Sequence, residues 1–150
     1  MTEYDKMASE HAWRYFELHA QQRITVFNFY IAITGLLAAG VGFSLQQKDV
    51  FIYLCPALGC FMVFISIIFW KLDHRVSMLV KNSETALRCI ENNFTNQDYK
   101  ILTKDNDDKS LNSSALSSWS YGQCFRIAFM FVGNTGVVFI FIPIITTLIK

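Results

Sequence analysis

The sequence predicts an all-α membrane protein with three transmembrane helices. The first observation is that residues 24–47, 50–70 and 127–149 contain no Asp, Glu, Lys or Arg. As a helix, each run would be about 30 to 36 Å long, which matches the hydrocarbon thickness of a bilayer. The second observation is helical periodicity in the charged segments beside these runs. We therefore expect a long N-terminal helix that runs into the first span and a cytoplasmic helical extension after the second.

Residues 1–23 are predicted to form a cytoplasmic amphipathic helix that continues into transmembrane helix 1 at residues 24–47. Thr2 and Asp5 form a variant of the capping box. No Pro or Gly occurs from Thr2 to Thr34, so nothing interrupts this helix. The segment is more acidic than basic, unlike the leader of a signal peptide, and we expect the first run to be retained as a span.

The remaining segments are transmembrane helix 2 at 50–70, a cytoplasmic helix and polar connection at 71–126, and transmembrane helix 3 at 127–149. Their orientation follows from the basic residues, because loops rich in Lys and Arg stay cytoplasmic. One side of the membrane would hold Lys48 and Lys150. The other side would hold Lys6, Arg14, Arg23, Lys71, Arg75, Lys81, Arg88, Lys100, Lys104, Lys109 and Arg126. The N-terminus and residues 71–126 are thus predicted to be cytoplasmic, with a tight outer turn at Gln47, Lys48 and Asp49.

Residues 71–92 have the periodicity of an amphipathic helix. Glu84 and Glu91 lie with Asp73 in a narrow acidic strip beside the apolar face. The apolar face itself comprises Leu72, Val76, Leu79, Val80, Ala86, Leu87 and Ile90. This spacing is typical of a helix that packs against other helices, although Ser83 interrupts it.

Basic side chains occupy the rest of that helix and suggest a ligand site. Arg75 lies next to Trp70 and the predicted membrane surface, where anionic lipid head groups are the simplest partner. Lys81 and Arg88 lie about 15 to 27 Å beyond the membrane end of the helix, out of easy reach of lipid. We predict that Lys81 and Arg88, with Arg75, bind a soluble anionic partner such as a nucleotide or an oligonucleotide.

One face of the N-terminal helix and first span contains no large apolar side chain. Its residues recur at a mean spacing of about 3.6, so they stay in register along a straight helix. The face consists of Glu10, Arg14, Glu17, Gln21, Thr25, Asn28, Ala32, Gly35, Ala39, Gly42 and Gln46. Its small residues suit close packing of membrane helices. Its polar half also suits a water path, because polar groups at membrane depth generally face protein or water.

A single such face cannot enclose a pore, so conduction requires a ring of several copies, predicted to number three to five. The predicted pore-lining residues are Glu10, Arg14, Glu17, Gln21, Thr25 and Asn28. Rings of Glu10 and Glu17 would favour cations, while Arg14 between them would oppose this preference. The alternative is a non-conducting membrane scaffold, or an accessory subunit of a larger complex, whose face packs against partner helices. In the third span, residues 133–136 favour helix packing over pore lining.

Other functional classes find no support in the sequence. The 13 basic and 12 acidic residues give no excess of positive charge for general nucleic-acid binding. The cysteines have neither CxxC nor zinc-site spacing, so we expect no metal and no cofactor. No phosphate-binding loop or nucleophile elbow occurs, and we do not expect an enzyme.

Short sequence patterns resemble those of small bacterial anti-phage membrane effectors. The likeness extends over residues 10–92. It is carried by Phe69-Trp70-Lys71-Leu72-Asp73-His74-Arg75, Leu79, Glu84-Thr85-Ala86-Leu87, Trp13-Arg14-Tyr15-Phe16 and His19-Ala20-Gln21-Gln22-Arg23. Among these effectors, the chain most resembles the channel subunits of the Hailong system.

This resemblance implies a homotetrameric ion channel in the bacterial inner membrane whose opening arrests the growth of an infected cell. It also implies that a single-stranded DNA oligomer, oligodeoxyadenylate, holds the channel shut. A partner nucleotidyltransferase would make this oligomer. The resemblance assigns no ligand residues, so Lys81 and Arg88 remain candidates on the basis of charge and position.

Overall fold

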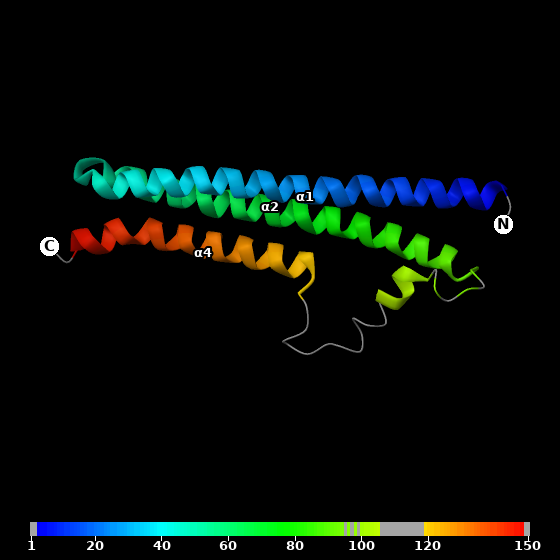
Figure 1. Ribbon diagram of the computed structural model, residues 1–150. Coiled ribbons are helices and arrows are strands. Elements are labelled where there is room, and N and C mark those ends of the chain that lie inside the picture. Colours follow the sequence, from blue (N-terminus) through cyan, green and yellow to red (C-terminus); the bar gives the residue numbers. More distant parts are fainter. Residues whose placement is uncertain (1–2, 95, 97, 99, 106–118, 149–150) are drawn as a thin grey trace. The chain divides into compact units, whose positions relative to one another are not determined.

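A computed structural model describes residues 3–94, 96, 98, 100–105 and 119–148. Its helices are α1 (Glu3–Gln46), α2 (Lys48–Glu91) and α4 (Tyr121–Leu148), and residues 101–105 form a short helix between the last two (Figure 1). Three helices are long and apolar enough to cross a membrane. The predicted all-α membrane fold is therefore confirmed. The predicted cap at Thr2, Lys150 and residues 106–118 of the predicted connection lie outside the described residues.

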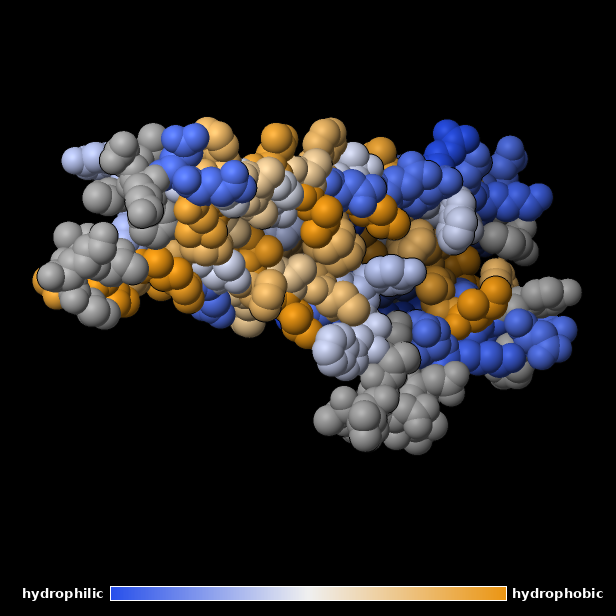
Figure 2. Space-filling view, turned by 60° about the vertical axis from the view of Figure 1, so that its left-hand side comes forward, coloured by the Kyte–Doolittle hydropathy of each residue, from blue (hydrophilic) through white to orange (hydrophobic). Residues whose placement is uncertain are grey.

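The chain divides into two compact units. We call the first the arm unit, formed by α1 up to Arg23 together with α2 from Arg75 and the short helix. We call the second the span unit, formed by Ile24–His74 and by α4. On the face shown in Figure 2, hydrophobic side chains gather over the middle of the helices and hydrophilic side chains gather toward their ends.

The turn between α1 and α2 is tighter than predicted. Gln47 alone separates the two helices, because the backbone of α2 is already helical at Lys48. The Gln47 N–H donates to the carbonyl of Ser44 over 3.3 Å, and the Ser44 hydroxyl donates to the carbonyl of Val41 over 2.8 Å. The first bond satisfies one of the carbonyl groups that the end of a helix would otherwise leave open, and the second gives the buried Ser44 hydroxyl an acceptor.

Aromatic side chains form the core of the span unit. Tyr30 is fully buried, and its ring makes an edge contact with Phe129 from α4 at a centroid distance of 4.7 Å. Its hydroxyl donates to the carbonyl of Ala128 over 3.4 Å and lies 3.1 Å from the hydroxyl of Ser66 in α2. One polar group is thereby satisfied between all three helices, as burial in an apolar core requires.

A pair of glycines brings α2 and α4 into backbone contact. A Cβ atom on Gly59 would lie 2.7 Å from the carbonyl oxygen of Gly136, and one on Gly136 would lie 2.8 Å from the carbonyl oxygen of Gly59. Any larger residue at either position would force the helices apart. The preference for packing predicted for residues 133–136 therefore holds at Gly136, while Asn134 is exposed.

The buried face of α2 differs in part from the predicted apolar face. Val76, Val80 and Leu87 are buried as predicted, but Leu72 is 38% exposed and Ala86 is exposed. The other buried side chains of this part of α2 are polar: Asp73, Ser77, Ser83 and Glu91. Hydrophobicity alone misplaces the face, because small or hydrogen-bonded polar side chains also fit a close helix contact.

Substitution of Gly136 by Ala should lower the stability of the span unit, since the new methyl group meets backbone 2.8 Å away. Overpacking of this kind costs about 1 to 3 kcal/mol. The matched control is Gly133→Ala on the same helix, where the methyl group would lie 3.5 Å from Ser66, an ordinary contact. Thermal unfolding in detergent measures both. Equal melting temperatures for the two variants would contradict the proposed role of Gly136.

Candidate functional site

The polar face of α1 points away from the core of its own chain. The buried side chains of this helix are Tyr30, Thr34, Val41 and Ser44. At about 100° per residue, they lie on the side of the helix opposite to the polar face. The predicted pore-lining residues are accordingly all exposed: Glu10, Arg14, Glu17, Gln21, Thr25 and Asn28.

The small residues of the same face are also open. Ala32, Gly35 and Ala39 are exposed, and a Cβ atom on Gly35 or Gly42 would meet no described atom within 4 Å. These glycines therefore serve no packing within the described part of the chain. Their absent side chains leave room for another helix or for water.

The charges of the polar face are partly paired. The Arg14 Nη2 atom lies 2.6 Å from Oε1 of Glu10, one helical turn earlier, and both side chains are largely exposed. An exposed pair of this kind adds less than about 1 kcal/mol to stability, but it offsets the charge of Arg14 locally. Glu17 has no ion-pair partner in the described ranges. The part of the face before the span, from Glu10 to Glu17, is thus acidic on balance.

Asn28 is a polar side chain that finds no partner within its own chain, as far as the structure describes it. It is exposed in a segment apolar enough to span a membrane, and its amide has no hydrogen bond to any residue that the structure describes. Asn134 in α4 is likewise exposed and has no hydrogen bond to a described residue. By contrast, the neighbouring Thr135 hydroxyl donates to the Phe131 carbonyl over 2.9 Å. Burial of an amide in hydrocarbon without a hydrogen bond costs roughly several kcal/mol of free energy. Both amides therefore require a hydrogen-bond partner from another chain or from water.

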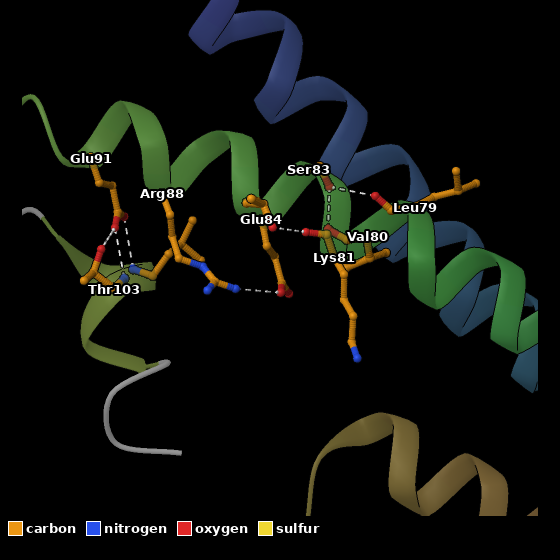
Figure 3. A network of polar contacts seen from close by, with 10 residues as sticks. Leu79, Val80, Lys81, Ser83, Glu84, Arg88, Glu91 and Thr103 are labelled. Carbon is orange, nitrogen blue, oxygen red and sulfur yellow. Dashed lines mark hydrogen bonds and ion pairs between the residues drawn. The ribbon is translucent and has the colours of Figure 1, made fainter. Parts of the chain in front are cut away.

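The predicted anion-binding residues lie on two sides of α2. Lys81 and Arg88 extend to the same side, and Arg88 points toward Glu84, with Nη2 3.6 Å from Oε2 (Figure 3). The Nε atom of Arg88 is buried without a hydrogen-bond partner in the described structure. Lys81 is exposed and has no ion pair with a described residue. Arg75 is exposed about 120° around the helix from Lys81, so helix geometry does not bring it to the other two.

Glu91 is a buried residue for which the sequence predicts no role. Its Oε1 accepts the N–H of Leu102, and its Oε2 accepts the N–H and the hydroxyl of Thr103, each over 3.0 Å (Figure 3). Burial raises the pKa of this carboxyl, but the hydrogen bonds from Leu102 and Thr103 outweigh burial and hold the pKa below its ordinary value. Glu91 thus ties the start of the short helix 101–105 to the end of α2. No periodic pattern links such distant partners, which is why the sequence does not reveal it.

The arm unit also contains a shallow hollow of about 270 Å³ between the start of α1 and the end of α2. Its lining comprises Asp5, Ala8, Ile90, Asn93 and Phe94. Within the described residues, no group of three or more His, Cys, Asp or Glu side chains is arranged to hold a metal ion. The exposed charges, amides and small residues described above suit recognition by charge, hydrogen bonding and helix packing.

Three helices apolar enough to cross a membrane, one of them with an exposed polar face, define a helical membrane protein. The chain belongs to the octameric membrane protein family (8xMP), which it matches over residues 6–145. It is 58% identical over 136 residues to CD-NTase-associated protein 19 of Escherichia coli, an alignment that covers 91% of this chain and 90% of that protein. No solved structure matches the chain. Neither match is to a channel subunit of the Hailong system, so that resemblance stays a hypothesis.

Substitution of Glu91 by Gln should loosen the short helix, because the amide lacks the charge that strengthens three hydrogen bonds. Hydrogen exchange at the Leu102 and Thr103 amides should accelerate by about tenfold or more. The control is Glu84→Gln, which removes the surface pair with Arg88 and should leave these amides protected. Unchanged exchange in Glu91→Gln would show that the carboxylate does not hold this segment.

The same contact predicts a dependence on pH. Because folding lowers the pKa of Glu91, its stabilising contribution is complete above the ordinary carboxyl pKa and is lost as the pH falls through the lower folded value. The protection factors of Leu102 and Thr103 in the wild-type protein should thus fall in acid. In Glu91→Gln they should lack this acid-dependent step.

Proposed function

We propose that this protein is an octameric ion channel of the bacterial inner membrane that acts as an anti-phage effector. The observation that carries the proposal is the exposed polar face of α1, which lies opposite to the packed core and continues into the span. We propose eight copies in place of the three to five predicted from the sequence and the four implied by the Hailong resemblance, because the description of the family names an octamer. One periodic polar face can enclose a pore only together with other copies of the chain, but the period of the face does not fix the number of subunits.

Geometry favours the larger ring for a pore lined by one helix from each copy. Eight helices spaced about 9 Å apart place their axes about 12 Å from the centre. After subtraction of a helix radius of about 5 Å, a lumen of about 7 Å radius remains, which admits hydrated ions. Four helices at the same spacing would leave about 1 Å. Such a wide lumen discriminates weakly, and the surplus of Glu10 and Glu17 over Arg14 gives it a modest preference for cations.

The orientation that we propose places the arm unit in the cytoplasm. Lys and Arg concentrate before the first span and between the second and third, as in cytoplasmic loops. Glu10 and Glu17 would then stand at the cytoplasmic mouth of the pore. Thr25 and Asn28 would line its entry into the membrane.

The name of the Escherichia coli relative supports a role in anti-phage defence beside a nucleotidyltransferase, the CD-NTase in that name. We propose that an anionic product of such an enzyme gates this channel at the arm unit. A single-stranded oligodeoxyadenylate, the ligand implied by the Hailong resemblance, has suitable chemistry. Lys81 supports this proposal because its ammonium group is exposed and unpaired within the described structure, and Arg88 extends beside it. An octamer would repeat these charges eight times around one ring.

A second candidate is a non-conducting scaffold or accessory subunit. The observation that favours it is the room beside Gly35 and Gly42, where another helix could pack closely. Purified protein in liposomes distinguishes the two functions. A channel passes potassium, whereas a scaffold gives no flux above that of empty vesicles.

Substitution of Asn28 by Leu should lower the ion flux severalfold, because apolar rings promote dewetting of a pore. The control is Phe29→Leu, since Phe29 is 62% exposed about 100° around the helix, away from the proposed lumen. Fluorescent flux assays on vesicles with equal protein content measure both variants. Equal flux in Asn28→Leu and the wild type would remove Asn28 from the pore.

Charge reversal of Lys81 and Arg88 together should weaken the binding of labelled oligodeoxyadenylate by about tenfold or more, since hydrogen bonds to charged groups contribute about 1.5 to 3 kcal/mol each. Lys6→Glu in α1 is the control for a charge reversal elsewhere on the chain, and it should leave the affinity unchanged. Fluorescence anisotropy in detergent measures binding, and native mass spectrometry verifies assembly. Unaltered affinity in an intact assembly would exclude Lys81 and Arg88 from the site.

A further inference from the structure

Trp13 is an exposed aromatic side chain in a helical segment rich in charge. It is 53% exposed, and its one ring contact among the described residues is with Phe16 of its own helix, at a centroid distance of 5.8 Å. On the other flank of the polar face, Leu18 is 61% exposed and Tyr15 is 36% exposed. Large apolar side chains left open outside a bilayer mark an interaction surface. The arm unit thus has two such surfaces, one on each side of its polar face.

The second flank has the layout of a socket for a side chain. His11, Arg14, Tyr15 and Leu18 are spaced i, i+3, i+4 and i+7, the four positions that surround an inserted side chain when helices pack side by side. All four are exposed. We call this group the socket. The ring of Tyr15 lies 4.2 Å from that of His19 in an edge contact, which supports one wall.

The two flanks point in the directions that a ring requires. At about 100° per residue, Trp13 and the centre of the socket are separated by about 150° across the polar face. In a closed ring, the directions from one copy to its two neighbours differ by about 135° for eight copies and by about 90° for four. The separation of about 150° given by helix geometry is closer to the value for eight copies than to the value for four. If the polar face points to the axis, Trp13 faces one neighbour and the socket faces the other.

We propose that Trp13 of each copy inserts into the socket of the next copy and so closes the octamer. Copies in a closed ring lie at the same height, and residue 13 lies within about 2 Å, along the helix, of the centre of the socket. The indole would cover Tyr15 and Leu18, and the guanidinium of Arg14 would lie over its ring face, a favourable cation–π contact. Arg14 remains close enough to Glu10 for both interactions.

We assign the socket to a second copy of this chain because the same chain carries both Trp13 and the socket, on opposite flanks of its polar face. A contact between two different surfaces of identical chains is heterologous and can close a ring. The family is described as octameric, and no described residue of the chain itself covers either flank. The inference rests on the octamer proposed above, but it does not depend on conduction. It would hold for a channel and for a scaffold.

Disulfide cross-linking in membranes tests the contact. Cys60, Cys89 and Cys124 are exposed and are replaced by Ala, while Cys55 is buried and is kept. Trp13→Cys is then combined in turn with His11→Cys, Tyr15→Cys and Leu18→Cys. Within one helix the Cβ atoms of each pair lie about 7 to 10 Å apart, too far for a disulfide, so any bond joins two copies. The matched control pairs Leu18→Cys with Ala12→Cys, since Ala12 lies half-buried on the other side of the helix and six residues away, too far for a disulfide within one helix.

We expect at least one of the three pairs to give a ladder of oligomers up to the octamer after oxidation, because each disulfide holds two neighbouring copies together in place of the lost indole. The single-cysteine variants and the control pair should remain monomeric on denaturing gels. Dimers from a single-cysteine variant would show a two-fold contact and overturn the proposal. Products whose masses are not multiples of the chain would identify another protein on this surface and would also overturn it.

Native mass spectrometry separates failure of this inference from failure of the proposed function. Octamers without a ladder would place the interface elsewhere and leave the octamer intact. Wild-type protein that is not octameric would refute the assembly itself. Trp13→Ala should shift octamers to smaller species, whereas Trp119→Ala, the same change at a tryptophan that is 59% exposed outside α1, should not. Equal assembly of both variants would contradict the role of Trp13.

Discussion

The interaction on which the structure depends is the anchoring of Tyr30 between the three spans. Its ring is fully buried and its hydroxyl reaches α2 and α4, so α1 has one rotational setting in the span unit. Asn28 lies about 160° around the helix from Tyr30. The contact that packs the core therefore also turns the amide of Asn28 outward. In this way a purely structural residue positions the candidate functional face.

The consequences differ between the two units. In the span unit, the exposed amides of Asn28 and Asn134 and the room beside Gly35 make the isolated chain incomplete in a bilayer. In the arm unit, exposed aromatic side chains flank an acidic face and leave apolar surface uncovered by the described residues of the chain. In the ring that we propose, copies around a common axis would relieve both deficits. Assembly and the formation of a polar lumen are then parts of one event.

The sequence predicts some of the candidate site better than the rest. The sequence places the eleven positions of the polar face on one side of α1, because they repeat with the period of a helix, and all of them except the half-buried Gly42 are exposed. The pairing of Arg88 with Glu84 was not predicted, although its i, i+4 spacing is one at which side chains on a helix meet. The apolar face of α2 was partly wrong, since Leu72 is open and Ser83 is buried with its hydroxyl bonded to the Val80 carbonyl. A prediction of buried positions from hydrophobicity misses a polar side chain whose hydrogen bond is made within its own helix.

The sequence by itself determined the three spans, the continuity of α1 through Arg23 and the polar face, because the physics of a bilayer and the period of a helix act on neighbouring residues. Only the tertiary structure decided which side of α1 packs, that Gly59 and Gly136 meet, and that Glu91 holds the short helix. Each of these facts joins segments distant in the chain. Such contacts depend on the shape and hydrogen bonding of both partners, which no local pattern encodes.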